Sequence, residues 1–138
     1  MRTKYLALPN CVLLFLMVSS ATGSEQPPSN LSSPGEVALQ QIQDGTYRYV
    51  YATTNVRLYV YEKDEPGKSN CTGGCALAWP PLAAGEKDQA IGDWTVIERE
   101  GGSKQWAYKG QPVYRFYHDS ANDPQGYRPA DGWYFLEP

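Results

Sequence analysis

Apolar and polar side chains alternate along most of the chain after residue 45, and a period of two predicts β-strands. The alternation is clearest over residues 47–51, where three tyrosines are separated by single residues. A second run at residues 58–61 follows turn-forming residues, so the two runs predict a hairpin. Further strands are predicted at residues 94–98, 105–108, 113–117 and 133–136, between turns at residues 101–102, 109–110 and 131–132.

A pattern of tyrosine, any residue, an aromatic residue, any two residues and aspartate occurs twice, 55 residues apart. At the same offset Tyr51 falls on Trp106 and Asn55 on Gly110. The two copies of the pattern consist of Tyr59, Tyr61 and Asp64, and of Tyr114, Phe116 and Asp119. We therefore expect two pseudo-repeated hairpin units, which form a small, mainly β single domain with short helical segments.

The aromatic face of the repeated strand is the same in both copies, whereas the opposite face differs. We expect the common face to be buried as a shared core. Each trailing aspartate is expected to accept backbone N–H hydrogen bonds and so begin a turn. Asn55 and Gly110 both tolerate positive φ, so one turn geometry is expected in both halves. Trp79 and Trp133 follow their aspartates by fifteen and fourteen residues.

The N-terminus has the pattern of a signal peptide over residues 1–23. Arg2 and Lys4 precede an apolar run at residues 11–18, and small residues at 19–23 offer a cleavage site. The apolar run is too short to span a membrane. We therefore expect a periplasmic or secreted protein with no stable membrane insertion after the signal peptide is cleaved.

Residues 24–44 differ in composition from the segment that follows them. The polar, proline-containing residues 24–33 are typical of a linker. Ser33 and Glu36 fit a capping box with Pro34 at the first helical position, and this predicts a short helix before residue 44. The two-repeat β domain is therefore expected to cover residues 45–138.

Two cysteines, Cys71 and Cys75, remain once Cys11 is removed with the signal peptide. In an oxidising compartment a single pair favours a disulfide, and the two glycines between them let the chain fold back. A redox-active pair, a zinc site and a haem attachment site are the alternatives. The three-residue spacing, the single histidine of the chain and the lack of a histidine after Cys75 argue against them.

The composition is acidic and aromatic, with a net charge of −3, eleven tyrosines and four tryptophans. An acidic domain without a cluster of Lys or Arg is a poor nucleic-acid binder. Trp79, Trp106 and Trp133 are candidates for a ligand-binding aromatic surface, although a domain of this size has to bury most of its aromatic residues. His118 is a further candidate ligand-binding residue, because the adjacent Asp119 could orient its imidazole.

These motifs resemble a family of bacterial secreted proteins and lipoproteins with a repeated Y-x-(F/W/Y)-x-x-D motif, known as the secreted repeat of unknown function. The resemblance covers residues 49–138 and includes both copies of the motif, the cysteine pair and the segment Trp79-Pro80-Pro81. Many members of this family are lipoproteins, and this chain departs from them because no cysteine follows the small residues of the leader. The resemblance implies an exported protein and no established activity.

Together these features favour a non-catalytic binding or interaction module of the cell envelope, with an unknown envelope partner or a small ligand. We expect no cofactor and no bound metal. An accessory role in envelope redox or metal handling is the alternative, through His118, Asp119 or the cysteine pair. A small enzyme is a third hypothesis. The sequence offers no plausible Ser or Cys nucleophile arranged around His118, which argues against a hydrolase.

Overall fold

Two hairpins of equal size open the two halves of the domain in the computed structural model, which describes residues 26–138. Strand β1 (Val37–Gln41) pairs antiparallel with β2 (Tyr47–Tyr51), and β4 (Trp94–Glu98) pairs antiparallel with β5 (Lys104–Tyr108). Val37 lies opposite Tyr51 and Trp94 lies opposite Tyr108, so the two registers match at a constant offset of 57 residues. The two hairpins are therefore counterparts of each other.

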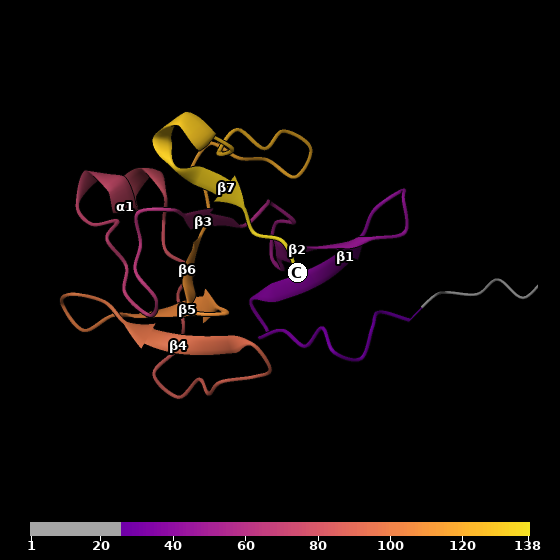
Figure 1. Ribbon diagram of the computed structural model, residues 1–138, viewed down its shortest axis with the longest axis horizontal. Coiled ribbons are helices and arrows are strands. Elements are labelled where there is room, and N and C mark those ends of the chain that lie inside the picture. Colours follow the sequence, from indigo (N-terminus) through magenta and orange to yellow (C-terminus); the bar gives the residue numbers. More distant parts are fainter. Residues whose placement is uncertain (1–25) are drawn as a thin grey trace, which may run out of the picture.

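The central strands bring the two halves together. Strand β3 (Tyr59–Tyr61) lies between β6 (Gln111–Tyr114) and β7 (Trp133–Phe135), in a five-stranded sheet of order β4-β5-β6-β3-β7 (Figure 1). Tyr59 lies directly opposite Tyr114, so the same position of the two repeats meets across the β3–β6 pair. Antiparallel pairing of equivalent positions relates the two halves by a pseudo-two-fold axis.

Backbone hydrogen bonds repeat the same symmetry away from this axis. The Leu82 amide donates to the Val113 carbonyl, and the Leu136 amide donates to the Leu58 carbonyl, each at 2.8–2.9 Å. In the same way, the Tyr117 amide donates to Ala78 and the Glu62 amide to Gly132. The short helices α1 (Gly74–Ala78) and η1 (Pro129–Asp131) occupy equivalent places before Trp79 and Trp133, on the upper side of the molecule in Figure 1.

The aromatic face of the repeated strands is buried, as the sequence predicts for Tyr59, Tyr114 and Phe116. The other face is buried as well, because successive strand residues point to opposite sides and a second core receives Leu58 and Val60. The first core consists of Tyr59, Cys71, Tyr114, Phe116 and Trp133. The second consists of Val37, Tyr49, Leu58, Val60, Leu82, Trp94, Trp106, Tyr108, Val113 and Leu136.

The short helix predicted before residue 44 is wrong, because this segment forms strand β1. Its capping groups have other partners: the Ser33 hydroxyl donates to the Val37 carbonyl, and Glu36 accepts a hydrogen bond from the Trp106 indole. Pairing with β2 supplies backbone partners that an isolated five-residue helix would lack. The folded domain therefore begins before residue 45.

The hairpin predicted from residues 47–51 and 58–61 is also wrong. Strand β2 pairs with β1, and only an isolated bridge between Val50 and Arg57 connects it to the residues before β3. Asn55 and Gly110 do adopt positive φ, 58° and 82°. The hairpin register shows that Tyr51 is the counterpart of Tyr108, not of Trp106, since two residues are inserted between β2 and β3.

The mainly β fold class is confirmed, with predicted and observed strands that agree closely at β4, β5 and β7. The strand predicted at residues 113–117 is shorter, and β6 ends at Tyr114. The predicted signal peptide at residues 1–23 lies outside the described residues. None of the helices formed by residues 26–138 has the length and apolar character needed to cross a membrane.

Candidate functional site

The tyrosine and aspartate of the repeated motif bind across the repeats, not within one repeat. The Tyr59 hydroxyl donates to the Asp119 carboxylate through a short hydrogen bond, and the Tyr114 hydroxyl donates to Asp64 over 2.7 Å. In each aspartate the other carboxylate oxygen accepts a backbone N–H six residues further on, from Asn70 at 2.6 Å and from Gln125 at 2.7 Å. The predicted turn-initiating role of both aspartates is thus confirmed, and each also binds the other repeat.

The surroundings shift the protonation of the tyrosine hydroxyls and of Asp64. Burial raises the pKa of the Tyr59 and Tyr114 hydroxyls, and the neighbouring carboxylates raise it further, so both remain donors at neutral pH. Burial also raises the pKa of Asp64, against the lowering effect of the bonds from Asn70 and Tyr114. Because both oxygens of each aspartate are engaged, the motif acts as a structural connection between the halves.

Four aromatic rings form a continuous stack on the pseudo-two-fold axis. The rings of Trp79 and Trp133 are nearly parallel, with centroids 4.3 Å apart and an interplanar angle of 4°. Tyr61 stacks on the outer side of Trp133 at 4.4 Å, and Phe116 packs on Trp79 at 4.8 Å. Each tryptophan therefore contacts the motif aromatic of the other repeat, as the tyrosine–aspartate pairs also do.

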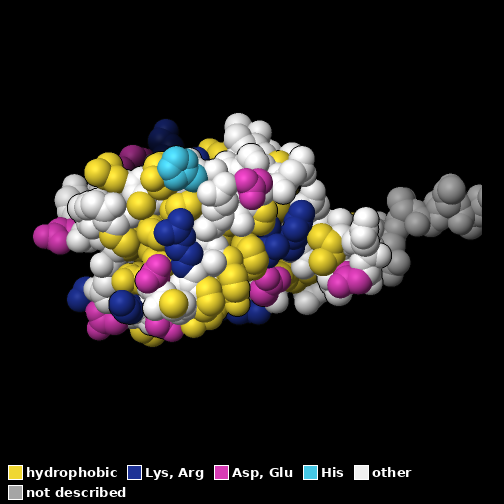
Figure 2. Space-filling view, turned by 90° about the horizontal axis from the view of Figure 1, so that it is seen from above, with side chains coloured by type: hydrophobic (Ala, Val, Ile, Leu, Met, Phe, Trp, Pro, Cys, Tyr) yellow, Lys and Arg dark blue, Asp and Glu magenta, His cyan; other side chains and the backbone are white. Residues whose placement is uncertain are grey.

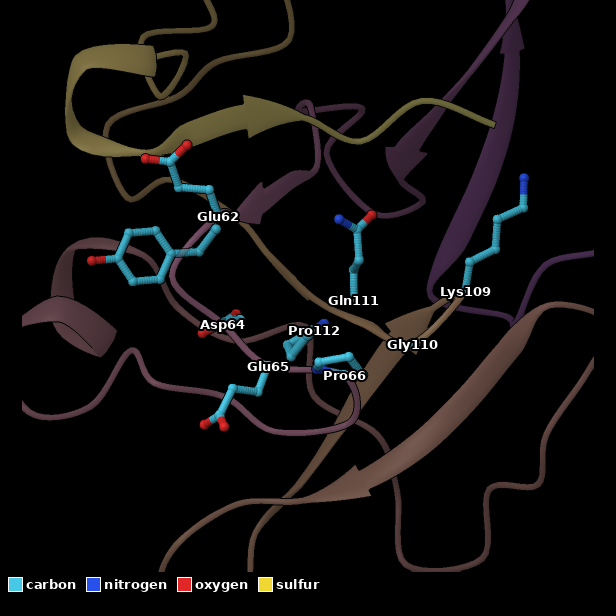
Figure 3. A pocket seen from close by; sticks show the side chains of 9 residues that line it. Glu62, Asp64, Glu65, Pro66, Lys109, Gly110, Gln111 and Pro112 are labelled. Carbon is cyan, nitrogen blue, oxygen red and sulfur yellow. The ribbon is translucent and has the colours of Figure 1, made fainter.

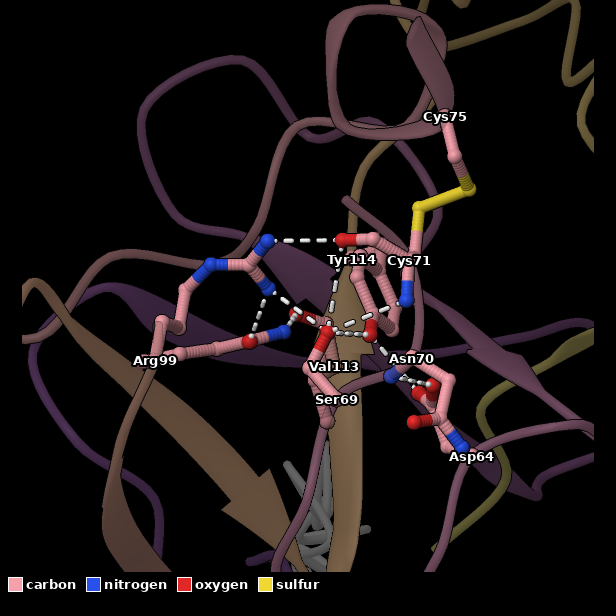
Figure 4. The surroundings of a disulfide bond; sticks show 9 residues. Asp64, Ser69, Asn70, Cys71, Cys75, Arg99, Val113 and Tyr114 are labelled. Carbon is pink, nitrogen blue, oxygen red and sulfur yellow. Dashed lines mark hydrogen bonds between the residues drawn. A yellow bond between two sulfur atoms is a disulfide. The ribbon is translucent and has the colours of Figure 1, made fainter. Parts of the chain in front are cut away.

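The Cys71–Cys75 disulfide is present and joins the buried end of a loop to helix α1 (Figure 4). Arg99 supports this loop, since its guanidinium donates three hydrogen bonds of 2.7 Å each, to the Cys71 carbonyl, the Ser69 hydroxyl and the Gln105 side chain. The second repeat keeps the same aspartate-centred turn without a disulfide. The disulfide is therefore not a requirement of the repeat.

Gly126 occupies the place of Cys71 in the second repeat. A Cβ atom there would lie 2.6 Å from Cζ of Tyr59 and 2.7 Å from Cβ of Phe116. Its amide donates to the Tyr59 hydroxyl at 3.2 Å. The close approach of backbone to ring thus explains why this repeat has glycine where the other has cysteine.

A hollow of about 170 Å³ lies between the first motif loop and the β5–β6 turn (Figure 3). Its rim carries the acidic residues Glu62, Asp64 and Glu65 and the basic residue Lys109. Glu65 pairs with Lys68 at 3.2 Å, and the side chains of Glu62, Glu65 and Lys109 point in different directions in Figure 3. Within residues 26–138, no group of three His, Cys, Asp or Glu side chains is arranged to hold a metal ion.

A second surface combines exposed apolar side chains with a cation, and we call Leu77, Tyr117, His118 and Arg128 the Leu77 surface. Leu77 is 79% exposed and Tyr117 is 59% exposed. The Tyr117 amide donates to the carbonyl of Ala78, the residue after Leu77, and the His118 ring packs on Tyr117 with ring centroids 3.8 Å apart. Figure 2 looks onto the side that carries the helices and shows His118, in cyan, beside exposed hydrophobic side chains.

The pseudo-two-fold axis relates the Leu77 surface to a site of different character. The mirrored positions are those of Asp131 for Leu77, Glu62 for Tyr117, Lys63 for His118 and, as the residue before the short helix, Gly73 for Arg128. The two halves thus share the residues of the motif and differ at this surface, where Leu77 and Tyr117 face the solvent in one half and charged residues take their places in the other. Sequence reasoning missed Leu77, Tyr117 and Arg128, although a comparison of the positions at which the repeats differ could have found them.

The other residues singled out from the sequence lie mostly in the cores. Trp106 and Trp133 are each 2% exposed and offer no surface to a ligand, while Trp79 is half-buried within the ring stack. The Trp106 indole donates to Glu36 at 3.1 Å. His118 is exposed at the end of the second motif, as a binding residue would need to be.

Comparison with known proteins identifies the repeat. A family model described as a secreted repeat of unknown function matches residues 55–83 and 95–133, and these two matches contain the two copies of the motif. No curated protein and no solved structure matches the chain. The family and the Cys71–Cys75 disulfide both indicate an exported protein. The chain therefore belongs to the family of the secreted repeat of unknown function and carries two copies of that repeat.

Proposed function

We propose that the protein is a non-catalytic binding module of the cell envelope, which contacts its partner through the Leu77 surface. The observation that carries this proposal is the divergence between mirrored sites. The motif aromatic residues, the motif aspartates and the stacked tryptophans are retained in both halves, whereas Leu77 and Tyr117 stand where the other half has Asp131 and Glu62. Exposed apolar side chains held on a rigid frame are typical of interaction sites.

The absence of a catalytic role is part of the proposal. The motif carboxylates Asp64 and Asp119 have both oxygens occupied by structural hydrogen bonds, so neither is free to act as a general base. His118 packs on Tyr117 at the surface, and Asp119 binds Tyr59 and Gln125. These contacts favour a role in binding a partner over a role in proton transfer.

The test is site-specific crosslinking in cells that export the full chain. A photo-reactive p-benzoylphenylalanine is placed at position 77 or, as the matched control, at the mirrored position 131. We expect a discrete adduct from position 77, weakened by Tyr117→Ala, and none from position 131. If position 77 yields no adduct, or both positions yield the same ones, the binding surface is refuted.

An accessory role in redox or metal handling remains the second candidate function, through the disulfide or His118. It predicts metal or haem in the protein purified from its exported fraction, or a disulfide that cycles between oxidised and reduced forms there. Native mass spectrometry, combined with thiol trapping of Cys71 and Cys75, distinguishes this role from a binding module. A stably oxidised chain without a bound group would support the binding module.

A further inference from the structure

We propose that the Leu77 surface binds a peptide group in which a carboxylate adjoins an apolar side chain, such as a free C-terminus with an apolar last residue. In this arrangement Arg128 receives the carboxylate, and Leu77 and Tyr117 cover the apolar part. The inference rests on the proposed function and specifies its ligand. The observation that supports it is that the Arg128 guanidinium has no ion-pair partner within residues 26–138.

Arg128 lies over aromatic rings without a charged partner. Its guanidinium carbon is 4.9 Å from the Phe116 ring centroid and 5.7 Å from that of Trp79. The Nε group donates to the Gln125 carbonyl at 3.3 Å. Arg128 forms no ion pair within residues 26–138, where the paired cations are Arg57, Lys68 and Lys104. Both terminal Nη groups are therefore directed to solvent or to a ligand.

Such a guanidinium suits a carboxylate. Stacking on Phe116 and the bond from Nε to Gln125 restrict the plane of the group before any ligand arrives. A planar fork of N–H donors matches the two oxygens of a carboxylate, and prior ordering reduces the entropy lost on binding. The mirrored residue, Gly73, has no side chain, so the other half of the domain lacks this feature.

The apolar part of the site adjoins Phe116, the residue that Arg128 covers. Tyr117 and His118 both contact the Phe116 ring, at centroid distances of 5.2 and 6.1 Å. Leu77 lies on α1 next to Ala78, whose carbonyl accepts a hydrogen bond from the Tyr117 amide, and the Cys71–Cys75 disulfide ties this helix to the loop before it. A ligand anchored by its carboxylate at Arg128 can therefore lay an apolar group over Tyr117 and Leu77.

Charge distinguishes a peptide carboxylate from a polyanionic surface. The chain has a net charge of −3, and the mirrored site carries Glu62 and Asp131. An anionic membrane or a nucleic acid would be repelled by these charges over its length, because such partners need several cations. A single carboxylate needs one available cation, which Arg128 supplies.

The test compares a carboxylate with its amide on the oxidised full chain. Isotope-labelled protein is titrated with acetyl-Ala-Ala-Leu, with the same peptide amidated at its C-terminus, and with vesicles that contain phosphatidylglycerol. We expect saturable NMR shifts at Leu77, Tyr117 and Arg128 with the acid, and about tenfold weaker binding of the amide, the lower range for a hydrogen bond to a charged group.

Variants separate the two parts of the site. Arg128→Gln should remove the preference for the acid, and Leu77→Ala should weaken the binding of both peptides. Spectra away from the site report whether each variant is folded. Equal binding of acid and amide, shifts elsewhere on the protein, no binding of either peptide, or binding of vesicles alone overturns the carboxylate proposal. Crosslinking at position 77 in cells then shows whether the binding surface itself survives.

Discussion

The hydrogen bonds from Tyr59 to Asp119 and from Tyr114 to Asp64 predict that mutations in one repeat are energetically coupled to mutations in the other. Tyr59→Phe removes a buried hydroxyl that donates to Asp119 and accepts from the Gly126 amide. A hydrogen bond to a charged group contributes about 1.5–3 kcal/mol, so we expect a loss of about 2 kcal/mol in the free energy of unfolding. By the pseudo-two-fold symmetry, Tyr114→Phe should cost about the same, since it removes the bonds to Asp64 and Ser69.

Double-mutant cycles test whether each motif tyrosine binds the aspartate of the other repeat. Tyr59→Phe combined with Asp119→Ala should show a coupling of about 1.5 kcal/mol or more, as should Tyr114→Phe with Asp64→Ala. Tyr59→Phe combined with Asp64→Ala, two changes within one motif that share no hydrogen bond, should be additive within about 0.5 kcal/mol. Urea unfolding followed by tryptophan fluorescence gives these energies. Coupling within each motif, with additivity between the repeats, would refute the exchanged arrangement.

Three further measurements address other parts of the molecule. Gly126→Ala should cost about 1–3 kcal/mol because its Cβ would meet Tyr59 and Phe116, while Gly35→Ala, with nothing within 4 Å, should be nearly neutral; equal effects in thermal melts would contradict the packing. Burial raises the pKa of Tyr59 and Tyr114, and raises that of Tyr49 to about 12. Their contribution to the free energy of unfolding is therefore complete below about pH 10, the pKa of an unfolded tyrosine, and is lost as the pH rises further. Unfolding and tyrosine absorbance should change together in that pH range, and ionisation of all tyrosines near pH 10 without unfolding would disprove their burial. Replacing both cysteines by serine should lower stability by about 2 kcal/mol, as expected for a short loop, and speed hydrogen exchange in α1 with the sheet intact; loss of the whole fold would show that the disulfide does more than fix one loop.

Local chemistry made part of this fold predictable. The alternation at residues 94–98 coincides with β4, and the positive φ of Asn55 and Gly110 follows from residue type. Strand β1 was missed because Ser33, Pro34 and Glu36 imitate a helix start, while the competing signal was only five residues long. Its equivalence to β4 at an offset of 57 residues would have corrected the assignment.

The exchanged pairs were beyond prediction for a different reason. A motif that contains both Tyr59 and Asp64 suggests that they contact each other, and only the β3–β6 pairing brings Tyr59 to Asp119 instead. The Leu77 surface is not predictable from the positions that the two copies share, because those positions are the buried residues of the motif. His118 was found because it adjoins the second motif, whereas Arg128 lies nine residues beyond Asp119.

The exchanged tyrosine–aspartate bonds also determine when folding can finish. When the chain appears with its N-terminal end first, Tyr59 and Asp64 become available before their partners Asp119 and Tyr114, which lie 50–60 residues later. Neither half can satisfy these buried tyrosine hydroxyls until the partner residues of the other half are available. Long-range contacts of this kind slow folding. The Cys71–Cys75 disulfide, by contrast, joins residues only four positions apart, so the first repeat can form it without the second.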